Sequence, residues 1–225
     1  MLDAIHWDTD LIRRYDQAGP RYTSYPTAVQ MHSGVGSFEL LHALRESRKE
    51  LRPLSLYVHV PFCAHVCYYC ACNKVITKDR GRAQPYLREL EHEMAIISHH
   101  LDRNQRVEQL HFGGGTPTFL SHDELRHLMS QLRQHFNLLD DDSGDYSIEI
   151  DPREADWSTM GLLRELGFNR VSLGVQDLDP AVQRAVNRLQ TLEETRSIVE
   201  AAHTLQFRSV NIDLIYGLPK QTPQS

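Results

Sequence analysis

The stretch Tyr57-Val-His-Val-Pro-Phe-Cys63-Ala-His-Val-Cys67-Tyr-Tyr-Cys70-Ala-Cys72 decides the fold and the chemistry expected of this chain. It holds all four cysteines of the 225 residues, within a window of ten positions. Disulfide-forming cysteines usually lie apart and join distant segments, whereas Cys-x3-Cys-x2-Cys spacing brings three thiolates to one point. The pattern therefore predicts a bound metal or an iron–sulfur cluster.

The kind of ligand set matters more than the number of cysteines. A structural zinc site normally takes two pairs of ligands from separate segments, and no second Cys/His pair with such spacing stands out. His65 is the nearest candidate for a fourth ligand, but it competes with Cys72. Three thiolates would leave one iron of a four-iron cluster open to a non-protein ligand. The cluster is our main hypothesis, and a zinc site or a redox dithiol is the alternative.

Composition is that of an ordinary soluble protein, with a net charge of -6 and 40% hydrophobic residues. The length suffices for one sizeable core. The mildly acidic balance gives no sign of a nucleic-acid surface. No apolar run reaches membrane-spanning length, and residues 1–14 mix charges where a signal peptide would be apolar. We therefore expect a cytoplasmic protein with no nucleic-acid or membrane partner and with reduced cysteines.

Strand-like and helix-like segments alternate five times, which is typical of parallel α/β folds. Capping signals mark several helices: Ser121 with Glu124, Thr191 with Glu194, Gly167 as a stop and Asp179 before a proline. Strands are predicted at residues 54–60, 109–112, 146–150, 170–175 and 209–216, and helices at 37–50, 84–101, 122–136, from 157 to 167, from 180 and after 191.

Polar residues follow each predicted strand. In parallel β/α barrels, ligands gather at the carboxyl ends of the strands. The sequence therefore predicts a site at this end, and the candidate residues, in chain order, are the cysteine loop, Gly113–Thr116, Glu149 and Asp151, Gln176 and Asp177, and Asp213.

The cysteine triplet after one strand and Gly113-Gly-Gly-Thr-Pro-Thr118 after the next resemble the radical S-adenosylmethionine (SAM) superfamily. Within it, the chain from about residue 15 onward resembles the oxygen-independent coproporphyrinogen III oxidase family. The motifs that carry the narrower resemblance are Arg21–Thr27, the fourth cysteine Cys72, Ile150–Glu154, Gly174–Asp177, Val186–Arg188 and Asn211–Pro223.

The resemblance implies a partial (β/α) barrel with parallel strands, preceded by an N-terminal arm. We expect residues 1–52 to form the arm and first helix, and residues 53–225 to form the barrel. Thr222-Pro223 is typical of a helix start, so the chain is expected to stop mid-fold, after the fifth of six strands.

A role for each motif residue is also implied. Cys63, Cys67 and Cys70 would ligate a [4Fe-4S] cluster, whose open iron SAM would chelate. Cys72 would be no ligand but would lie near the reaction, and we expect a catalytic role for it, against the alternative of a small buried side chain. Tyr57, Gly114 and Glu149 resemble contacts of the cluster-bound SAM. The positions that resemble contacts of a second SAM molecule are Tyr69, Gly115, Thr116, Gln176, Arg188 and Asp213.

The residue types suit these roles. Glycine lets backbone amides approach a ligand without a Cβ, and a carboxylate such as Glu149 suits an ammonium, a sulfonium or a ribose hydroxyl. Arg188 would pair with a SAM carboxylate, although it could instead pair with a neighbouring acid at the surface.

The implied reaction is the anaerobic conversion of coproporphyrinogen III to protoporphyrinogen IX. A radical derived from SAM would remove hydrogen from two propionates, and loss of carbon dioxide and an electron would leave vinyl groups. We expect a monomer that is served by a protein electron donor of unknown identity. Arg21, with Tyr22 and Tyr25, is the candidate substrate contact in the arm, although these tyrosines could simply pack on the barrel.

The alternative function is that of a haem chaperone from a related radical SAM family, which binds haem without this turnover. That family lacks the fourth cysteine and the arm. The presence of Cys72 and of the segment Arg21–Thr27 therefore favours the enzyme.

Overall fold

The computed structural model of the chain describes residues 7–17 and 27–222. The predicted substrate contacts at Arg21, Tyr22 and Tyr25 and the predicted helix start at Pro223 lie outside these residues. The chain divides into two compact units, residues 1–43 and 44–225.

The first unit contains α1 (Thr9–Tyr15), the 3-10 helix η1 (Ala28–Gln30) and the start of α2 (Ser37–Lys49). The Asp8 carboxylate caps α1 by accepting hydrogen bonds from two backbone N–H groups of its first turn. The domain boundary expected between residues 52 and 53 lies just past the end of α2 and stays a prediction.

The second unit is built on a parallel sheet with the order β1-β4-β6-β7-β8, and β5 pairs with β4. This confirms the predicted parallel α/β fold, with each predicted strand in its place. The strands are β1 (Leu54–Val60), β4 (Arg106–Gly114), β5 (Asn137–Leu138), β6 (Asp145–Ile150), β7 (Arg170–Gln176) and β8 (Ser209–Leu214).

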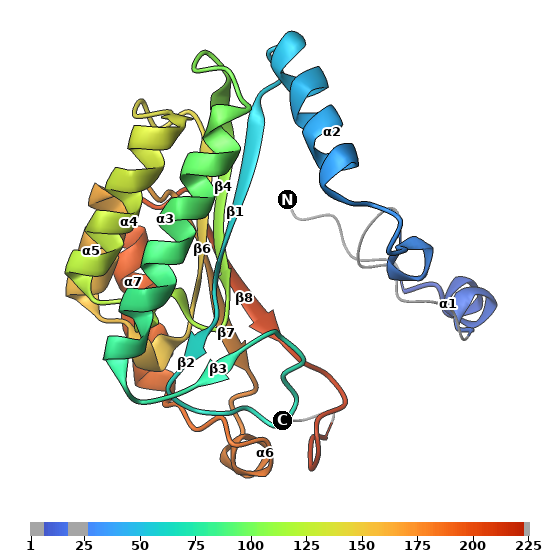
Figure 1. The fold of residues 1–225 in the computed structure, drawn as a ribbon. Coiled ribbons are helices and arrows are strands. Elements are labelled where there is room, and N and C mark those ends of the chain that lie inside the picture. Colours follow the sequence, from blue (N-terminus) through green and yellow to red (C-terminus); the bar gives the residue numbers. More distant parts are fainter. Residues whose placement is uncertain (1–6, 18–26, 223–225) are drawn as a thin grey trace. The chain divides into compact units, whose positions relative to one another are not determined.

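Four long helices lie together on one side of this sheet (Figure 1). Both capping boxes expected from the sequence are formed, by Ser121 with Glu124 and by Thr191 with Glu194. The short helix α6 begins after Asp179, which caps it as predicted. The helices of this unit are α3 (Ala83–His99), α4 (His122–His135), α5 (Trp157–Glu165), α6 (Pro180–Ala185) and α7 (Leu192–Thr204), with 3-10 helices η2 (Arg80–Arg82), η3 (Pro117–Phe119) and η4 (Pro152–Glu154).

The core lies among the strands and these helices. Alternate residues of a strand point to opposite faces of a sheet. In β4, Leu110 and Phe112 are fully buried, whereas His111 between them is partly exposed and contacts Ser147 and Glu149. The two faces of the sheet therefore differ: one is apolar and packs in the core, and the other carries polar side chains.

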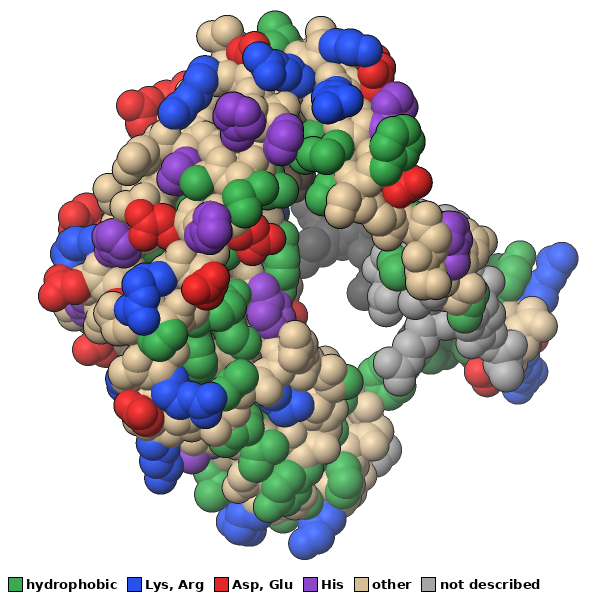
Figure 2. Space-filling model, viewed as in Figure 1, with side chains coloured by type: hydrophobic (Ala, Val, Ile, Leu, Met, Phe, Trp, Pro, Cys, Tyr) green, Lys and Arg blue, Asp and Glu red, His purple; other side chains and the backbone are tan. Residues whose placement is uncertain are grey.

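On the face shown in Figure 2, acidic, basic and histidine side chains of the described residues are interspersed over the helical layer. This distribution fits the modest net charge of -6. Within residues 7–17 and 27–222, no helix combines the length and the apolarity needed to cross a bilayer.

Candidate cofactor site

The cysteine loop is closed at its base by a small second sheet. β2 (Phe62–Cys63) pairs in parallel with β3 (Val75–Ile76). The Val75 N–H donates to the Pro61 carbonyl at 2.7 Å, and the Thr77 N–H donates to the Cys63 carbonyl at 2.9 Å. The sequence did not predict these short strands, because two-residue segments leave no periodic pattern. They hold the two ends of the loop together.

All four cysteines are free thiols. Cys63, Cys67 and Cys70 are half-buried, whereas Cys72 is exposed. Burial raises the pKa of the Cys63 thiol, and it also raises the pKa of Cys72, where the neighbouring Cys70 adds to the effect.

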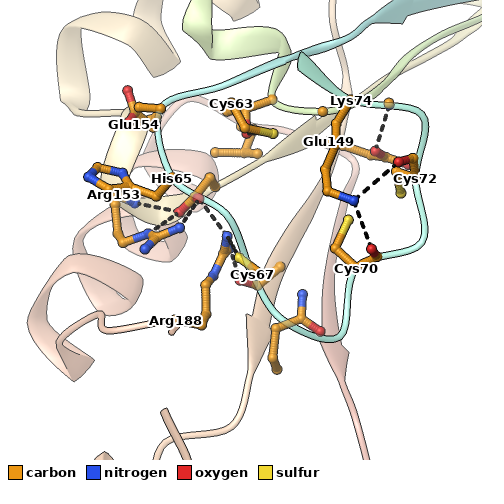
Figure 3. A pocket seen from close by; sticks show the side chains of 18 of the residues that line it. Cys63, His65, Cys67, Cys70, Cys72, Lys74, Glu149, Arg153, Glu154 and Arg188 are labelled. Atoms are coloured by element: carbon orange, nitrogen blue, oxygen red, sulfur yellow. Dashed lines mark hydrogen bonds and ion pairs between the residues drawn. The ribbon is translucent and has the colours of Figure 1, made fainter. Parts of the chain in front are cut away.

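Internal and external hydrogen bonds hold the shape of the loop. The Lys74 ammonium donates to the Cys70 carbonyl at 2.8 Å and to the Cys72 carbonyl at 3.4 Å (Figure 3). The Asn187 side chain donates to the Val66 carbonyl at 2.7 Å, which ties the loop to the segment after α6. The loop is thus held from within by Lys74 and is tied to one distant segment by Asn187.

The glycine motif after β4 packs against the cysteine loop. The Gly115 N–H donates to the Val60 carbonyl at 2.8 Å, and the Thr116 N–H donates to the Phe62 carbonyl at 2.9 Å. The Thr116 hydroxyl lies 3.6 Å from the Cys63 sulfur. A Cβ on Gly115 would stand 2.7 Å from the Phe62 carbonyl oxygen, so glycine is required here for contact between two backbones.

Glu149, at the end of β6, is held by groups of β4. Its carboxylate accepts a hydrogen bond from the Gly114 N–H at 3.2 Å and lies 3.3 Å from His111 Nε2. Burial opposes ionisation, but the hydrogen bonds from His111 and Gly114 hold the pKa of Glu149 below its usual value. Gly114 adopts φ +114°, a conformation that favours glycine, and a Cβ there would meet the His59 ring.

Asp151, Arg153 and Arg188 form a buried ionic cluster. Asp151 Oδ2 lies 2.5 Å from Arg188 Nη1 and 2.7 Å from Arg153 Nη2. Burial opposes ionisation of Asp151, but the hydrogen bond from Arg153 and the charges of both arginines lower its pKa. Arg188 also donates to the Gly174 carbonyl, and its Nε is buried without a hydrogen-bond partner among the described residues. The sequence had left open a surface ion pair for Arg188; the pair exists, but it is buried.

The ends of β7 and β8 complete the site. Asp213 accepts hydrogen bonds from the Ser172 hydroxyl at 2.8 Å and from the Asn211 amide at 2.7 Å. Gln176 adopts φ +70°, at an irregularity in the pairing of β7 with β8.

These elements enclose a cavity of about 220 Å³ at the carboxyl ends of the strands (Figure 3). The predicted site residues that line it are Cys63, Cys67, Tyr69, Cys70, Cys72, Gly114, Gly115, Thr116, Glu149, Gln176, Arg188 and Asp213.

Tyr57 does not line this cavity. Its hydroxyl lies 3.1 Å from His59 Nδ1, and its ring stacks on His111 with 5.7 Å between the ring centres. His111 in turn lies 3.3 Å from Glu149, and the cofactor role of Tyr57 stays a prediction.

Several other residues of the cavity have no role implied by the family resemblance. Asp151 and Arg153 lie in a quoted motif, but nothing in one sequence shows that an acid is buried. Ser172 and Lys74 have no local signal at all. The candidate Asp151 also lines the cavity, together with Ala64, His65, Lys74, Ile150, Arg153, Glu154, Ser172 and Gly174.

The residues fit an iron–sulfur cluster. Three half-buried thiols line one cavity, and thiolates are the usual ligands of such clusters. A partnerless Arg188 Nε beside them offers a donor that a bound group would satisfy. Among the described residues, no three His, Cys, Asp or Glu side chains are grouped closely enough to hold a single metal ion.

Comparison with known families decides between the hypotheses. Residues 57–225 match the model of the radical SAM superfamily. The chain belongs to the radical SAM superfamily. Membership implies a [4Fe-4S] cluster and SAM as cofactors, and it confirms the expected superfamily.

Curated relatives of the chain carry a narrower name than the superfamily. The oxygen-independent coproporphyrinogen III oxidase of Pseudomonas aeruginosa is 78% identical over 225 residues, which are 100% of this chain and 49% of the relative. The protein of the same name from Escherichia coli is 48% identical over 224 residues, 100% of this chain and 48% of the relative. The chain thus spans about half the length of these relatives.

Solved structures agree with the sequence comparison. The coproporphyrinogen III oxidase of Escherichia coli, described as a radical SAM enzyme, superposes with a TM-score of 0.87 at 45% identity, over 98% of this chain and 48% of that one. The radical SAM methyltransferase TsrM from Kitasatospora setae gives a TM-score of 0.52 at 14% identity, over 87% of this chain and 36% of that one. The second likeness concerns the fold alone.

Proposed function

We propose that the chain carries the cofactor-binding part of an oxygen-independent coproporphyrinogen III oxidase. The reaction is the oxidative decarboxylation of two propionate side chains of coproporphyrinogen III to vinyl groups, giving protoporphyrinogen IX. The observation that carries the proposal is the cavity in which all four cysteines meet Glu149 and Asp213. The 78% identity with the Pseudomonas aeruginosa oxidase supports the choice of substrate.

Cys63, Cys67 and Cys70 are the proposed cluster ligands. The closed loop and the Cys63–Thr116 contact hold these thiols at the cavity wall. The Lys74 ammonium donates to the Cys70 carbonyl and so fixes the turn around Cys70. The Cys70 thiol takes no part in this bond and stays available as a ligand.

Two SAM sites are proposed along the strand ends. Glu149 and Gly114, with Tyr57 nearby, serve the cluster-bound SAM, because an ionised Glu149 suits the cationic amino or sulfonium group. Tyr69, Gly115, Thr116, Gln176, Arg188 and Asp213 serve the second molecule. All six line the cavity that Gly114 and Glu149 also line.

When bound, the cluster and SAM supply the radical that removes a hydrogen atom from a propionate β-carbon. The substrate then loses carbon dioxide and passes one further electron to an electron acceptor, so that a vinyl group remains. The chain's own residues position the reactants and exclude water and oxygen. Cys72 is the one cysteine of the loop that is exposed, and we propose that its thiol acts on the substrate or the second SAM.

A protein electron donor, a monomeric state and a cytoplasmic location complete the proposal. The haem-chaperone alternative has no observation in its favour: the two closely similar curated relatives described above are named oxidases, and Cys72 lies in the cavity wall.

The test is an anaerobic assay with coproporphyrinogen III, SAM and a low-potential reductant, with the Pseudomonas aeruginosa relative run beside the chain. Protoporphyrinogen IX and carbon dioxide are the expected products. Tight haem binding without either product would instead favour the chaperone.

A further inference from the structure

Asp151 joins two arginines beneath one side of the cysteine loop. Its carboxylate accepts from Arg153 Nε at 3.0 Å and Nη2 at 2.7 Å, and from Arg188 Nη1 at 2.5 Å. The exposed fractions of the three side chains are 7% for Asp151, 16% for Arg153 and 9% for Arg188. One negative charge is thus shared by two positive charges in a buried place.

The two arginines and the one aspartate leave a net positive charge, and this charge lies beside Cys67. Arg188 Nη1 is 3.8 Å from the Cys67 sulfur (Figure 3). Arg153 lines the same cavity as Cys67, and Asp151 joins it to Arg188; burial alone would lower the pKa of Arg153, but this carboxylate raises it. Cys63, by contrast, contacts the neutral hydroxyl of Thr116. The environments of two proposed cluster ligands therefore differ in charge.

Groups around the ligand sulfurs tune an iron–sulfur cluster, because hydrogen bonds and positive charge stabilise the reduced state, which holds one more electron. We propose that Arg153, fixed by Asp151, is a positioning residue that together with Arg188 keeps positive charge against the Cys67 thiolate and so raises the reduction potential of the cluster. This inference rests on the proposed ligation by Cys67 and not on the identity of the substrate.

The shared carboxylate explains why two arginines can stay close together. Without Asp151, like charges would repel each other at short range in a poorly solvated place. With it, Arg153 is held through two of its nitrogens, which restricts the guanidinium to one orientation. Arg188 is fixed independently by the Gly174 carbonyl.

The test is an anaerobic redox titration, followed by electron paramagnetic resonance, of the chain reconstituted with iron and sulfide and without SAM or substrate. The variants are Arg153→Gln, which removes the charge, and Arg153→Lys, which keeps it. Arg164→Gln is the matched control, because Arg164 also binds one carboxylate through two nitrogens, at 3.0 and 2.9 Å, but does not line the cavity.

We expect Arg153→Gln to shift the midpoint potential to a more negative value, Arg153→Lys to shift it less, and Arg164→Gln to leave it unchanged. The inference would be overturned if the midpoint potential of Arg153→Gln equalled that of Arg164→Gln or were more positive than that of the parent chain. If Arg153→Gln takes up little iron, Arg153→Lys decides: a full cluster at near the original potential supports the role of charge, whereas loss of the cluster in both overturns it.

Failure of this inference can be distinguished from failure of the proposed function. A negative shift in Arg153→Gln together with no decarboxylation by the parent chain counts against the substrate assignment alone. Absence of any cluster in the parent chain counts against both proposals.

Discussion

Gly115 and Phe62 are in backbone contact, at the point where the strand that precedes the cysteine loop meets the glycine motif. A Cβ on Gly115 would stand 2.7 Å from the Phe62 carbonyl oxygen and 2.8 Å from the Pro61 carbonyl group. Both obstacles are main-chain atoms, which cannot rotate away as a flexible side chain can.

Gly115→Ala is therefore expected to displace the base of the cysteine loop. Overpacking of this kind costs about 1–3 kcal/mol of stability. The measurement is urea unfolding of the metal-free chain, together with the iron content after reconstitution, and we expect both to fall. Gly161→Ala is the control, because nothing lies within 4 Å of a Cβ at that helical position. It should stabilise the chain slightly, by up to about 1 kcal/mol. Equal behaviour of the two variants would contradict the proposed contact.

Asp151→Asn should destabilise the chain by about 3 kcal/mol, because removal of one partner leaves two arginines uncompensated in a buried place. Chemical unfolding of the metal-free chain measures this. Asp145→Asn is the comparison: Asp145 pairs with Arg170 at 3.2 Å, but both side chains are about half exposed. That change should cost less than about 1 kcal/mol. If Asp151→Asn loses no more free energy of unfolding than Asp145→Asn does, the ionic cluster of Asp151, Arg153 and Arg188 adds little to stability.

Cys72→Ser should retain the cluster and lose decarboxylation, because Cys72 is exposed and is not a proposed ligand. Cys67→Ser should lose most of the cluster. Iron and sulfide analysis with the visible absorption spectrum checks both variants. If Cys72→Ser loses iron as completely as Cys67→Ser does, then Cys72 is a ligand.

Acid stability should depend on Asp142. The hydrogen bond from Arg164 is the main cause that lowers the pKa of Asp142 below its ordinary value of 3.8, and Asn169 contributes as well. A carboxyl group whose pKa is depressed by folding adds stability at pH values above its unfolded pKa, and this stability is lost as the pH falls through the folded pKa. The free energy of unfolding should therefore drop below about pH 4 by more in the parent chain than in Asp142→Asn. Because Asp142 is about one-third exposed, the difference should be small. Parallel pH profiles of the two proteins would argue against this role.

Much of the barrel was predictable because its signals are local. The Ser121/Glu124 and Thr191/Glu194 capping boxes and the Asp179 cap are formed as the sequence indicates. Each signal depends on a few neighbouring residues that satisfy backbone groups at a helix end, so it needs no knowledge of the rest of the chain.

Long-range contacts could not be predicted in this way. Asp151 meets Arg188 from 37 positions away, and Arg80 meets Glu154 from 74 positions away. Residue type alone gives no pairing for such charges. The glycine motif illustrates a partial success: its place beside the cysteine loop was expected, but the space that Gly114 and Gly115 leave is occupied by His59 and by the Pro61–Phe62 backbone.

The central claim is that Cys63, Cys67 and Cys70 hold a [4Fe-4S] cluster with one iron open to SAM. The most direct measurement is the electron paramagnetic resonance spectrum of the anaerobically reconstituted and reduced chain, recorded with and without SAM. We predict a reduced-cluster signal that changes when SAM is added and that is absent in Cys67→Ser. A cluster signal indifferent to SAM, or a colourless protein that retains zinc, would contradict the claim.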